Sequence, residues 1–297
     1  MGTRSSQSAR LSFIEFQLPS LSEAPPEGDG WIHEIKHDGY RTQLIIERGK
    51  ARALTRRGYN WSSKYPTIVE AAAALLAESA ILDGEVVVFD EKGISDFHAL
   101  PWAIRREPER LVFIAFDLLH IDGEDMRFKP VVQRRARLSD LLVRGPADGA
   151  IQFSEELPCS GAEFFKQCER LGLEGMVSKR VSAPYRSGRT ETWLKTKCFE
   201  ESVYEVAGVL REPGQPAVAY LVTPDKERRY VGGAFITLNR EIRERLWERV
   251  RANATPVRGV ERKPGIEWLK PGLIARVRYL KGEEGLRHAT LREVDEL

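Results

Sequence analysis

The pattern of apolar residues changes near residue 200 of this 297-residue chain, and this change most limits the possible folds. Before it, strand-like apolar runs are mixed with helix-like segments in irregular order. After it, short strand-like runs are separated by glycine and proline, and one helix-like segment covers about 239–251. A chain of this length also exceeds what a single hydrophobic core usually supports. We therefore expect two domains, spanning residues 31–199 and 200–297.

Residues 31–199 carry the signals of an α+β domain. A hairpin is expected over 44–56, where two strand-like runs flank a turn at Arg48-Gly49-Lys50. Valine-containing runs at 80–90 and 111–121 predict buried strands, and helices are expected at about 66–78, 133–143 and 161–171. Because strands and helices do not alternate regularly, the domain should contain antiparallel or mixed sheets with helices rather than a doubly wound parallel sheet.

The two ends of the chain predict simpler structures. Residues 1–30 are polar and include Pro25-Pro26, so we expect an extended N-terminal segment, with ordered structure starting near Trp31. Residues 200–297 contain strand-like runs at 203–210, 217–222, 229–236 and 274–280. Several short strands with a single helix favour a small β-barrel such as an OB-fold, which is a common nucleic-acid-binding module.

The composition excludes several classes of protein. The chain is 42% hydrophobic and 30% charged, as in globular proteins, and no apolar run approaches the roughly 20 residues that span a bilayer. Its three cysteines, Cys159, Cys168 and Cys198, form no CxxC pair and indicate neither a zinc site nor a disulfide framework. We expect a cytoplasmic protein without membrane contact. Because the formal net charge is only +2, any nucleic-acid-binding face must come from local groups of Lys and Arg.

A lysine at a predicted strand end gives the first indication of chemistry. It is Lys36, in the sequence EIKHDGYR at 34–41. A lysine attacks phosphorus only as the free amine, and at its usual pKa of about 10.4 only on the order of one molecule in a thousand is neutral near pH 7. A bound metal or the neighbouring Arg41 could lower this pKa, and Asp38 offers a carboxylate to position the reacting groups. Taken alone, the pattern fits a charged hairpin loop equally well.

Five further motifs follow in order: TRRG at 55–58, LDGE at 82–85, FDLL at 116–119, EGMVSK at 174–179 and WLKTK at 193–197. The series resembles the covalent nucleotidyltransferases, which comprise DNA ligases, RNA ligases and mRNA capping enzymes. Six motifs in this order are far more specific than any one. Arg41, the string FDLLHIDG at 116–123 and the stretch GLRH at 285–288 look most like the ligase domain of bacterial end-joining DNA ligases. The resemblance implies a nucleotidyltransferase (adenylation) domain followed by an OB-fold.

The resemblance also implies which residues bind the nucleotide. Lys36 would become covalently adenylated by ATP, Glu34 would read the amino group of adenine, and Phe116 would stack on the base. Such stacking contributes roughly 1–3 kcal/mol, although Phe116 in an apolar strand would otherwise be assigned to the core. Arg41 and Arg56 would contact the sugar and the phosphates.

Charged residues of the later motifs would hold a metal and the phosphates. The resemblance implies that Glu85 binds the ribose or a metal, and that Glu174 holds the divalent cation, Mg²⁺ or Mn²⁺. An isolated glutamate would usually be interpreted as a solvated surface group. Lys195 and Lys197 alternate along a strand, so both should face one side and contact the α-phosphate, whose charge grows in the transition state.

The C-terminal motif departs from the family pattern. Ligases usually continue after a stretch like GLRHATL at 285–291 to a further arginine, an acid and a lysine, whereas here Arg292 is followed only by EVDEL. The resemblance places an arginine that binds pyrophosphate in this motif, and the candidates are Arg287 and Arg292. The alternative is that both side chains merely lie on a barrel strand.

The expected function is therefore sealing of nicked duplex DNA with ATP. Lys36 would attack ATP, AMP would pass to the 5′-phosphate of the nick, and the 3′-hydroxyl would displace AMP. Because only about 30 residues precede the first motif, we expect no large extra DNA-binding domain, so the two domains themselves, or end-joining and repair proteins, should hold the DNA. We also expect a monomer. The alternatives are an RNA ligase, a GTP-using capping enzyme, and a catalytically inactive nucleic-acid-binding relative. The intact set of charged motif residues argues against the last.

Overall fold

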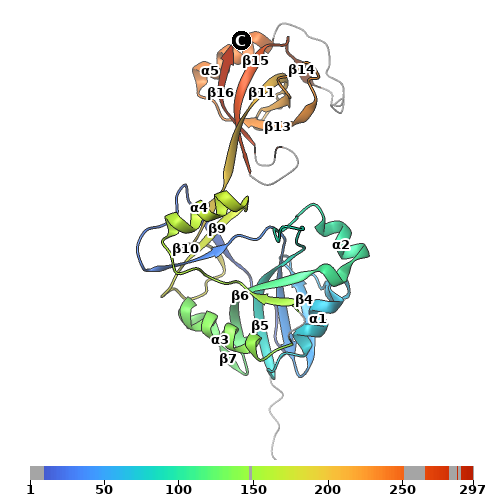
Figure 1. The fold of residues 1–297 in the computed structure, drawn as a ribbon, viewed down its shortest axis with the longest axis vertical. Helices are drawn as coiled ribbons and strands as arrows, with labels where there is room; N and C mark the ends of the chain where they lie inside the picture. The colour runs from blue at the N-terminus through green and yellow to red at the C-terminus, as the bar shows by residue number, and fades with distance from the viewer. Residues whose placement is uncertain (1–9, 147–148, 251–264, 281–285, 287–288, 297) are drawn as a thin grey trace, which may run out of the picture. The chain divides into compact units, whose positions relative to one another are not determined.

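The computed structural model describes residues 10–146, 149–250, 265–280, 286 and 289–296 (Figure 1). The chain divides into two compact units, Met1–Lys197 and Cys198–Leu297. Each unit has its own hydrophobic core. In the described part of the chain, no helix is long and apolar enough to cross a bilayer.

The larger sheet of the first unit is built on the predicted hairpin. Its path is β4(Lys50–Thr55)-β3(Tyr40–Glu47)-β5(Ser79–Val87)-β6(Val112–Ile121)-β7(Glu124–Asp125), and β8(Ile151–Phe153) pairs with β6 in parallel. All pairings along the path are antiparallel. The hairpin and both buried strands that the sequence predicted are confirmed, with ends shifted by a few residues.

The second sheet of this unit has the order β1(Gln17–Leu21)-β10(Gly188–Lys197)-β9(Gly175–Arg180)-β2(Trp31–Ile35), with β1 parallel to β10. The prediction that ordered structure starts near Trp31 was wrong. Strand β1 lies inside the segment predicted as extended, and both its first residue, Gln17, and the preceding Phe16 are buried. The reason is tertiary: the partner strand of β1 lies about 170 residues away, so no local pattern announces the pairing.

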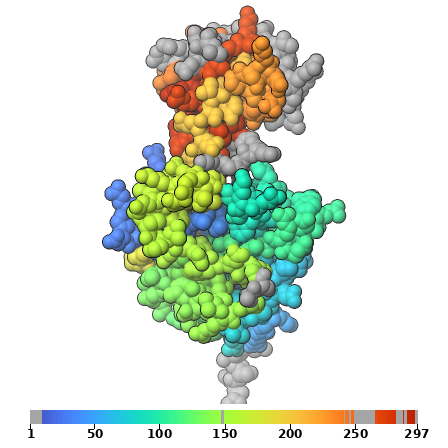
Figure 2. Space-filling view, in the orientation of Figure 1, coloured from blue at the N-terminus to red at the C-terminus, as the bar shows by residue number. Residues whose placement is uncertain are grey.

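Helices cover the sheets of the first unit. They are α1(Pro66–Ala73), α2(Leu100–Arg106), α3(Val131–Val143) and α4(Gly161–Leu171), with short 3₁₀ turns at Ser62–Lys64, Pro108–Arg110 and Met126–Phe128. Helix α1 ends five residues earlier than predicted because the chain turns at Ala74 toward β5. Helix α4 has the predicted bounds, set by a capping box between Ser160 and Glu163 and by Gly172 in the left-handed conformation. In the space-filling view, α3, α4 and the segment around α2 form much of the visible surface of this unit (Figure 2).

A small apolar cluster joins the two sheets of the first unit. Ile45, Ile81 and Leu119 of the larger sheet pack with Trp193 of β10 and with Tyr185 just before it. The partly buried ring of Phe116 lies against this cluster. The two sheets therefore meet face to face, and residues of both can line a common pocket.

The second unit has one six-stranded sheet. Its elements are β11(Phe199–Leu210), β12(Val218–Val222), β13(Tyr230–Ile236), α5(Arg240–Val250), β14(Ile266–Trp268), β15(Leu273–Leu280) and β16(Thr290–Glu296). The order is β12-β13-β16-β15-β11-β14, and β12 also pairs with β11. The four predicted strands and the predicted helix are confirmed. Strands β14 and β16 were not predicted.

Candidate active site

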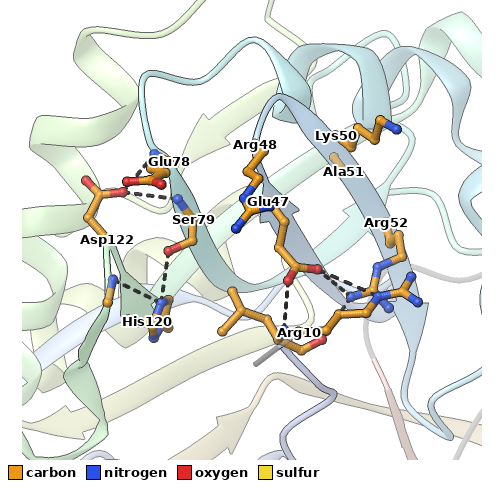
Figure 3. A pocket seen from close by; sticks show the side chains of 12 residues that line it. Arg10, Glu47, Arg48, Lys50, Ala51, Arg52, Glu78, Ser79, His120 and Asp122 are labelled. Atoms are coloured by element: carbon orange, nitrogen blue, oxygen red, sulfur yellow. Dashed lines mark hydrogen bonds and ion pairs between the residues drawn. The ribbon is translucent and has the colours of Figure 1, made fainter. Parts of the chain in front are cut away.

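A pocket between the two sheets of the first unit gathers residues from five of the predicted motifs. Its walls include Glu34, Lys36, Arg41, Glu85 and Phe116. Pro19, Lys179 and Trp193 complete the side formed by β1, β9 and β10. A larger open groove lies at the opposite end of β3, and none of the predicted site residues lines it. There the carboxylate of Glu47 accepts Arg52 at 2.9 Å and lies 4.0 Å from Arg10 (Figure 3), so acidic groups offset its cations.

Three motif glycines allow the backbone of this site to pack closely. A Cβ atom at Gly39 would lie 2.2 Å from the carbonyl oxygen of Val86, and one at Gly84 would lie 2.5 Å from that of Ile114. Gly175 has φ +147°, and a Cβ atom there would lie 2.2 Å from the carbonyl oxygen of Thr196. The glycines of KxDG, DGE and EGMVSK are thus required by strand packing around the pocket.

Gly175→Ala is expected to lower the free energy of unfolding by about 2–4 kcal/mol, because both the φ angle and the contact with Thr196 oppose a side chain. Gly172→Ala is the matched control. Gly172 also has positive φ but has no atom within 4 Å of a Cβ, so we expect a cost of about 1 kcal/mol. Urea unfolding of both variants measures the difference. Equal costs would show that the packing at Gly175 is not restrictive.

Lys36 lies beside Glu174 because of the strand register between β2 and β9. The amide of Lys36 donates to the carbonyl of Gly175 at 3.0 Å, which extends the β2–β9 ladder by one residue. The Nζ atom of Lys36 donates to Oε2 of Glu174, and Nζ of Lys197 lies 3.4 Å from Oε1 of the same carboxylate. One carboxylate therefore receives two lysines from opposite neighbours of β9.

Lys195, the other lysine of the predicted pair, belongs to the same cluster. Burial lowers the pKa of Lys195, and the positive charges of Lys197, Lys36 and Arg189 lower it further. The pKa of His37 is also lowered by burial, to about 4, so that this ring is neutral near pH 7 and adds no charge beside Lys36. The structure thus concentrates lysines around one point, as a site for a polyanion requires.

Glu85 is the carboxylate of this pocket best suited to hold a divalent cation. Burial raises its pKa to about 7, against the opposing effects of Arg41 and Lys36. Among the described residues, no hydrogen bond or ion pair holds its carboxylate. Nor do the described residues contain any group of three or more His, Cys, Asp or Glu placed to hold a metal. A site with one or two carboxylates fits Mg²⁺, which usually keeps waters and substrate phosphates as its other ligands.

Arg41 is fixed before any substrate binds. Its Nε and Nη2 atoms donate to Asp83 at 2.6 and 2.7 Å, and Tyr185 donates to the same carboxylate at 2.8 Å. The guanidinium also lies 4.4 Å from the ring centroid of Phe116. Its role with the sugar and phosphates stays a prediction, and only the part of the guanidinium not held by Asp83 is available for it.

Glu34 lines the pocket and is buried within a network of donors. Arg135 and Lys179 each donate to its Oε1 atom at 2.7 Å, and Ser154 donates to Oε2 at 2.9 Å. Lys179 also donates to the carbonyl of Phe116 at 2.9 Å. Burial lowers the pKa of Lys179 to about 8, although Glu34 acts in the opposite direction.

Other residues of the predicted site lie outside this pocket or outside the described residues. Arg56 is exposed just after β4 and has no described partner, and Arg292 is exposed on β16, while Arg287 lies outside the described residues. Conversely, the sequence did not single out Arg135 or Lys179. One signal existed: Arg134 and Arg135 occupy positions on the apolar face of α3, where the helical period predicts core residues.

Comparison with known proteins is consistent with this geometry. The model of the ATP-dependent DNA ligase domain matches residues 17–197. The multifunctional non-homologous end joining protein LigD of Pseudomonas aeruginosa is 35% identical over 288 residues, which cover 92% of this chain and 34% of that protein. The LigD of Mycobacterium tuberculosis is 28% identical and is also matched over 34% of its length. The chain thus spans about a third of these relatives.

Solved structures agree with the sequence comparison. The ligase domain of Mycobacterium tuberculosis LigD has a TM-score of 0.60, 28% identity and 95% coverage of both chains. A mycobacterial DNA ligase D complexed with ATP and MES has a TM-score of 0.61, 27% identity and the same coverage. The mixed sheets and few helices of this chain match those of DNA ligase structures. Together with the domain match over more than half of the sequence, this shows that the chain belongs to the ATP-dependent DNA ligase domain family.

Proposed function

We propose that this chain seals nicks in duplex DNA with ATP, through a lysyl-AMP on Lys36 and then a DNA-adenylate, as part of end-joining repair. The observation that carries the proposal is the cluster of Lys36, Lys195 and Lys197 around Glu174, beside a pocket that Lys36 and Glu85 line. The names of the LigD relatives support the repair role. A cytoplasmic location and a monomeric state remain predictions from the sequence.

The contact between Lys36 and Glu174 bears on the first step of the proposed reaction, the attack of Lys36 on ATP. Lys36 must lose a proton before its amine attacks the α-phosphate. Until then its Nζ atom donates to the carboxylate of Glu174. ATP that enters the site brings phosphates that compete for the same lysines. Lys195 and Lys197 are then placed to stabilise the negative charge that grows on the α-phosphate.

We infer that Glu85 and Glu174 hold the divalent cation, Mg²⁺ or Mn²⁺. When bound, such a cation would neutralise phosphate charge and favour the free amine of Lys36. Binding would also give the carboxylate of Glu85 the partner that it lacks among the described residues. Asp38, whose charge acts on Glu85, belongs to the same acidic edge of the site.

The remaining walls of the pocket fit a purine nucleotide. Phe116 offers an aromatic ring partly open to the pocket, and Glu34 offers a carboxylate acceptor for the amino group of adenine. In this proposal Arg41 contacts the sugar through the part of its guanidinium that Asp83 does not hold. Arg56 lies at the end of β4 near Thr42, so it is available for the outer phosphates.

We further propose that the second unit is an OB-fold barrel. The support is its pairing pattern, in which β11-β12-β13-β16-β15 returns to β11 and forms a closed circuit of five strands. Glycines Gly232 and Gly233 on β13 suit the strong bending that such a barrel needs. In this proposal the unit contributes to DNA binding and supplies Arg287 or Arg292 to the leaving pyrophosphate.

A chain that ends at Lys197 is expected to lose reaction with ATP, because it lacks the arginine that stabilises departing pyrophosphate. Arg287→Ala and Arg292→Ala, made separately, should show which arginine acts. Substitution of the arginine that contacts pyrophosphate should slow adenylation more than it slows sealing of DNA that is already adenylated. Rapid-quench assays of both steps make the comparison, with Arg276→Ala on β15 as a surface control. If both variants adenylate at the parental rate, the second unit serves only DNA binding.

DNA binding is expected to weaken steeply with salt. The chain has a net charge of only +2, so binding must rest on local contacts of Lys and Arg with phosphates. Each neutralised phosphate contributes about −0.9 to the slope of log affinity against log salt concentration. Fluorescence anisotropy with a nicked duplex between low and moderate salt gives the slope. A flat dependence would contradict this mode of binding.

The decisive experiment is self-labelling followed by nick sealing. Incubation with α-labelled ATP or GTP and Mg²⁺ or Mn²⁺ should label the protein with AMP only. A nicked DNA duplex should then be sealed. Labelling with GMP would instead indicate a capping-type enzyme, sealing of RNA nicks only would indicate an RNA ligase, and no labelling would indicate an inactive nucleic-acid-binding relative.

A further inference from the structure

Arg135 is held from three directions in the interior of the first unit. Its Nη1 atom donates to Glu34 at 2.7 Å, its Nη2 atom donates to the carbonyl of Ser154 at 2.8 Å, and its guanidinium lies 4.6 Å from the ring centroid of Phe153. The residue is 4% exposed and Glu34 is 2% exposed. Arg135 therefore has a single position, and it fixes that of the Glu34 carboxylate.

Stability alone does not account for this group of charges. Glu34 receives two buried cations, and the only other carboxylate near Arg135 among the described residues, Glu156, is half exposed and 3.6 Å away. Removing charges from water costs several kcal/mol per ion, and buried ion pairs are often no more stabilising than apolar side chains of the same size. An excess of buried positive charge around one carboxylate is better explained by a need to hold that carboxylate in one position.

The hydrogen bonds of Glu34 leave one acceptor position unused. A carboxylate has about four lone-pair positions, two on each oxygen. Among the described residues, the Oε1 atom receives Arg135 and Lys179, and Oε2 receives only Ser154. Glu34 lines the pocket next to Phe116, Lys179 and Trp193. The free position on Oε2 can therefore accept an N–H donor from a base in the pocket.

We propose that Arg135 is a positioning residue that sets the base specificity of the site, with Ser154 as its partner. By fixing Glu34 as an acceptor, it selects a purine with an amino group at position 6, such as adenine. Guanine presents an oxygen there, and two acceptors repel each other. This inference rests on the proposed function, because it assumes that a purine nucleotide occupies the pocket.

The test compares ATP with purine riboside triphosphate, which lacks only the 6-amino group. The measured quantity is kcat/KM for covalent labelling of the protein by each nucleotide. A hydrogen bond to a charged acceptor predicts a preference of about 10- to 100-fold for ATP in the parent. Arg135→Lys and Ser154→Ala should each reduce this preference several-fold, because Oε2 is then less well oriented.

Arg134→Lys is the matched control. Arg134 is the neighbouring residue on α3, is equally buried, and makes two hydrogen bonds of 2.7 Å to Asp117 instead of Glu34. A general disturbance of α3 would affect both lysine variants alike, whereas the proposal predicts that only Arg135→Lys loses preference for ATP. A ratio of the two nucleotides is insensitive to the fraction of protein that is folded.

The outcomes separate this inference from the proposed function. If the parent is not labelled by ATP, the proposed function fails. If the parent is labelled but does not distinguish the two nucleotides, or if Arg135→Lys and Ser154→Ala keep the full preference, the inference fails while the function stands. Should Arg135→Lys not fold, as judged by its thermal melt, Ser154→Ala decides, since it removes one hydroxyl and leaves the ion pairs in place.

Discussion

Lys36→Ala is expected to abolish covalent labelling of the protein by ATP while it preserves some sealing of DNA that already carries AMP. In the proposed reaction the first step needs the amine of Lys36 as the nucleophile, whereas the last step uses the 3′-hydroxyl of the nick. The loss should be complete within the sensitivity of a gel assay with α-labelled ATP. Pre-adenylated nicked DNA provides the second substrate in the same reaction conditions.

Lys36→Arg is the control that separates chemistry from charge. A guanidinium can keep an ion pair with Glu174 but stays protonated and cannot attack phosphorus. We therefore expect Lys36→Arg to be as inactive in labelling as Lys36→Ala and to bind ATP better. Label on either variant would show that another residue is the nucleophile, and the role of the KxDG motif would have to be abandoned.

Glu174→Gln should slow labelling by about 10²- to 10³-fold, the usual cost of removing one fixed electrostatic group from a site of charge transfer. The amide cannot neutralise Lys36 and Lys197, and it is a poor ligand for a divalent cation. The measurement is the single-turnover rate of labelling over a titration of Mg²⁺. A higher concentration of Mg²⁺ should recover part of the rate.

The direction of this effect distinguishes two roles of Glu174. If the carboxylate acted only by holding the Nζ atom of Lys36 away from ATP, Glu174→Gln would speed the labelling reaction. Glu191→Gln, an exposed glutamate on β10, provides a control that should leave the rate unchanged. A faster reaction in Glu174→Gln would show that Glu174 is not a metal ligand. The cation would then have to be held by Glu85 and Asp38 alone.

Local patterns in the sequence determined much of this protein. The hairpin of β3 and β4, the strand β5 and the helix α4 follow from apolar periodicity, a turn and a capping box that all lie within a few residues of each other. The order of the motifs was enough to predict the family and to select Lys36, Glu85 and Glu174. The close approach of strands at Gly175 explains one of the motif glycines.

Tertiary structure decided what depends on distant pairing. Strand β1 forms only because β10 provides its hydrogen bonds from across the sequence, and Glu174 reaches Lys36 only through the register of β9 with β2. The contact of Arg135 with Glu34 joins residues 101 positions apart. Sequence periodicity reports that a position is buried, but not which charged groups will share the buried space. For this reason Lys36 could be proposed as the nucleophile from the sequence itself, whereas the hydrogen bonds around Glu34 became visible only in the folded protein.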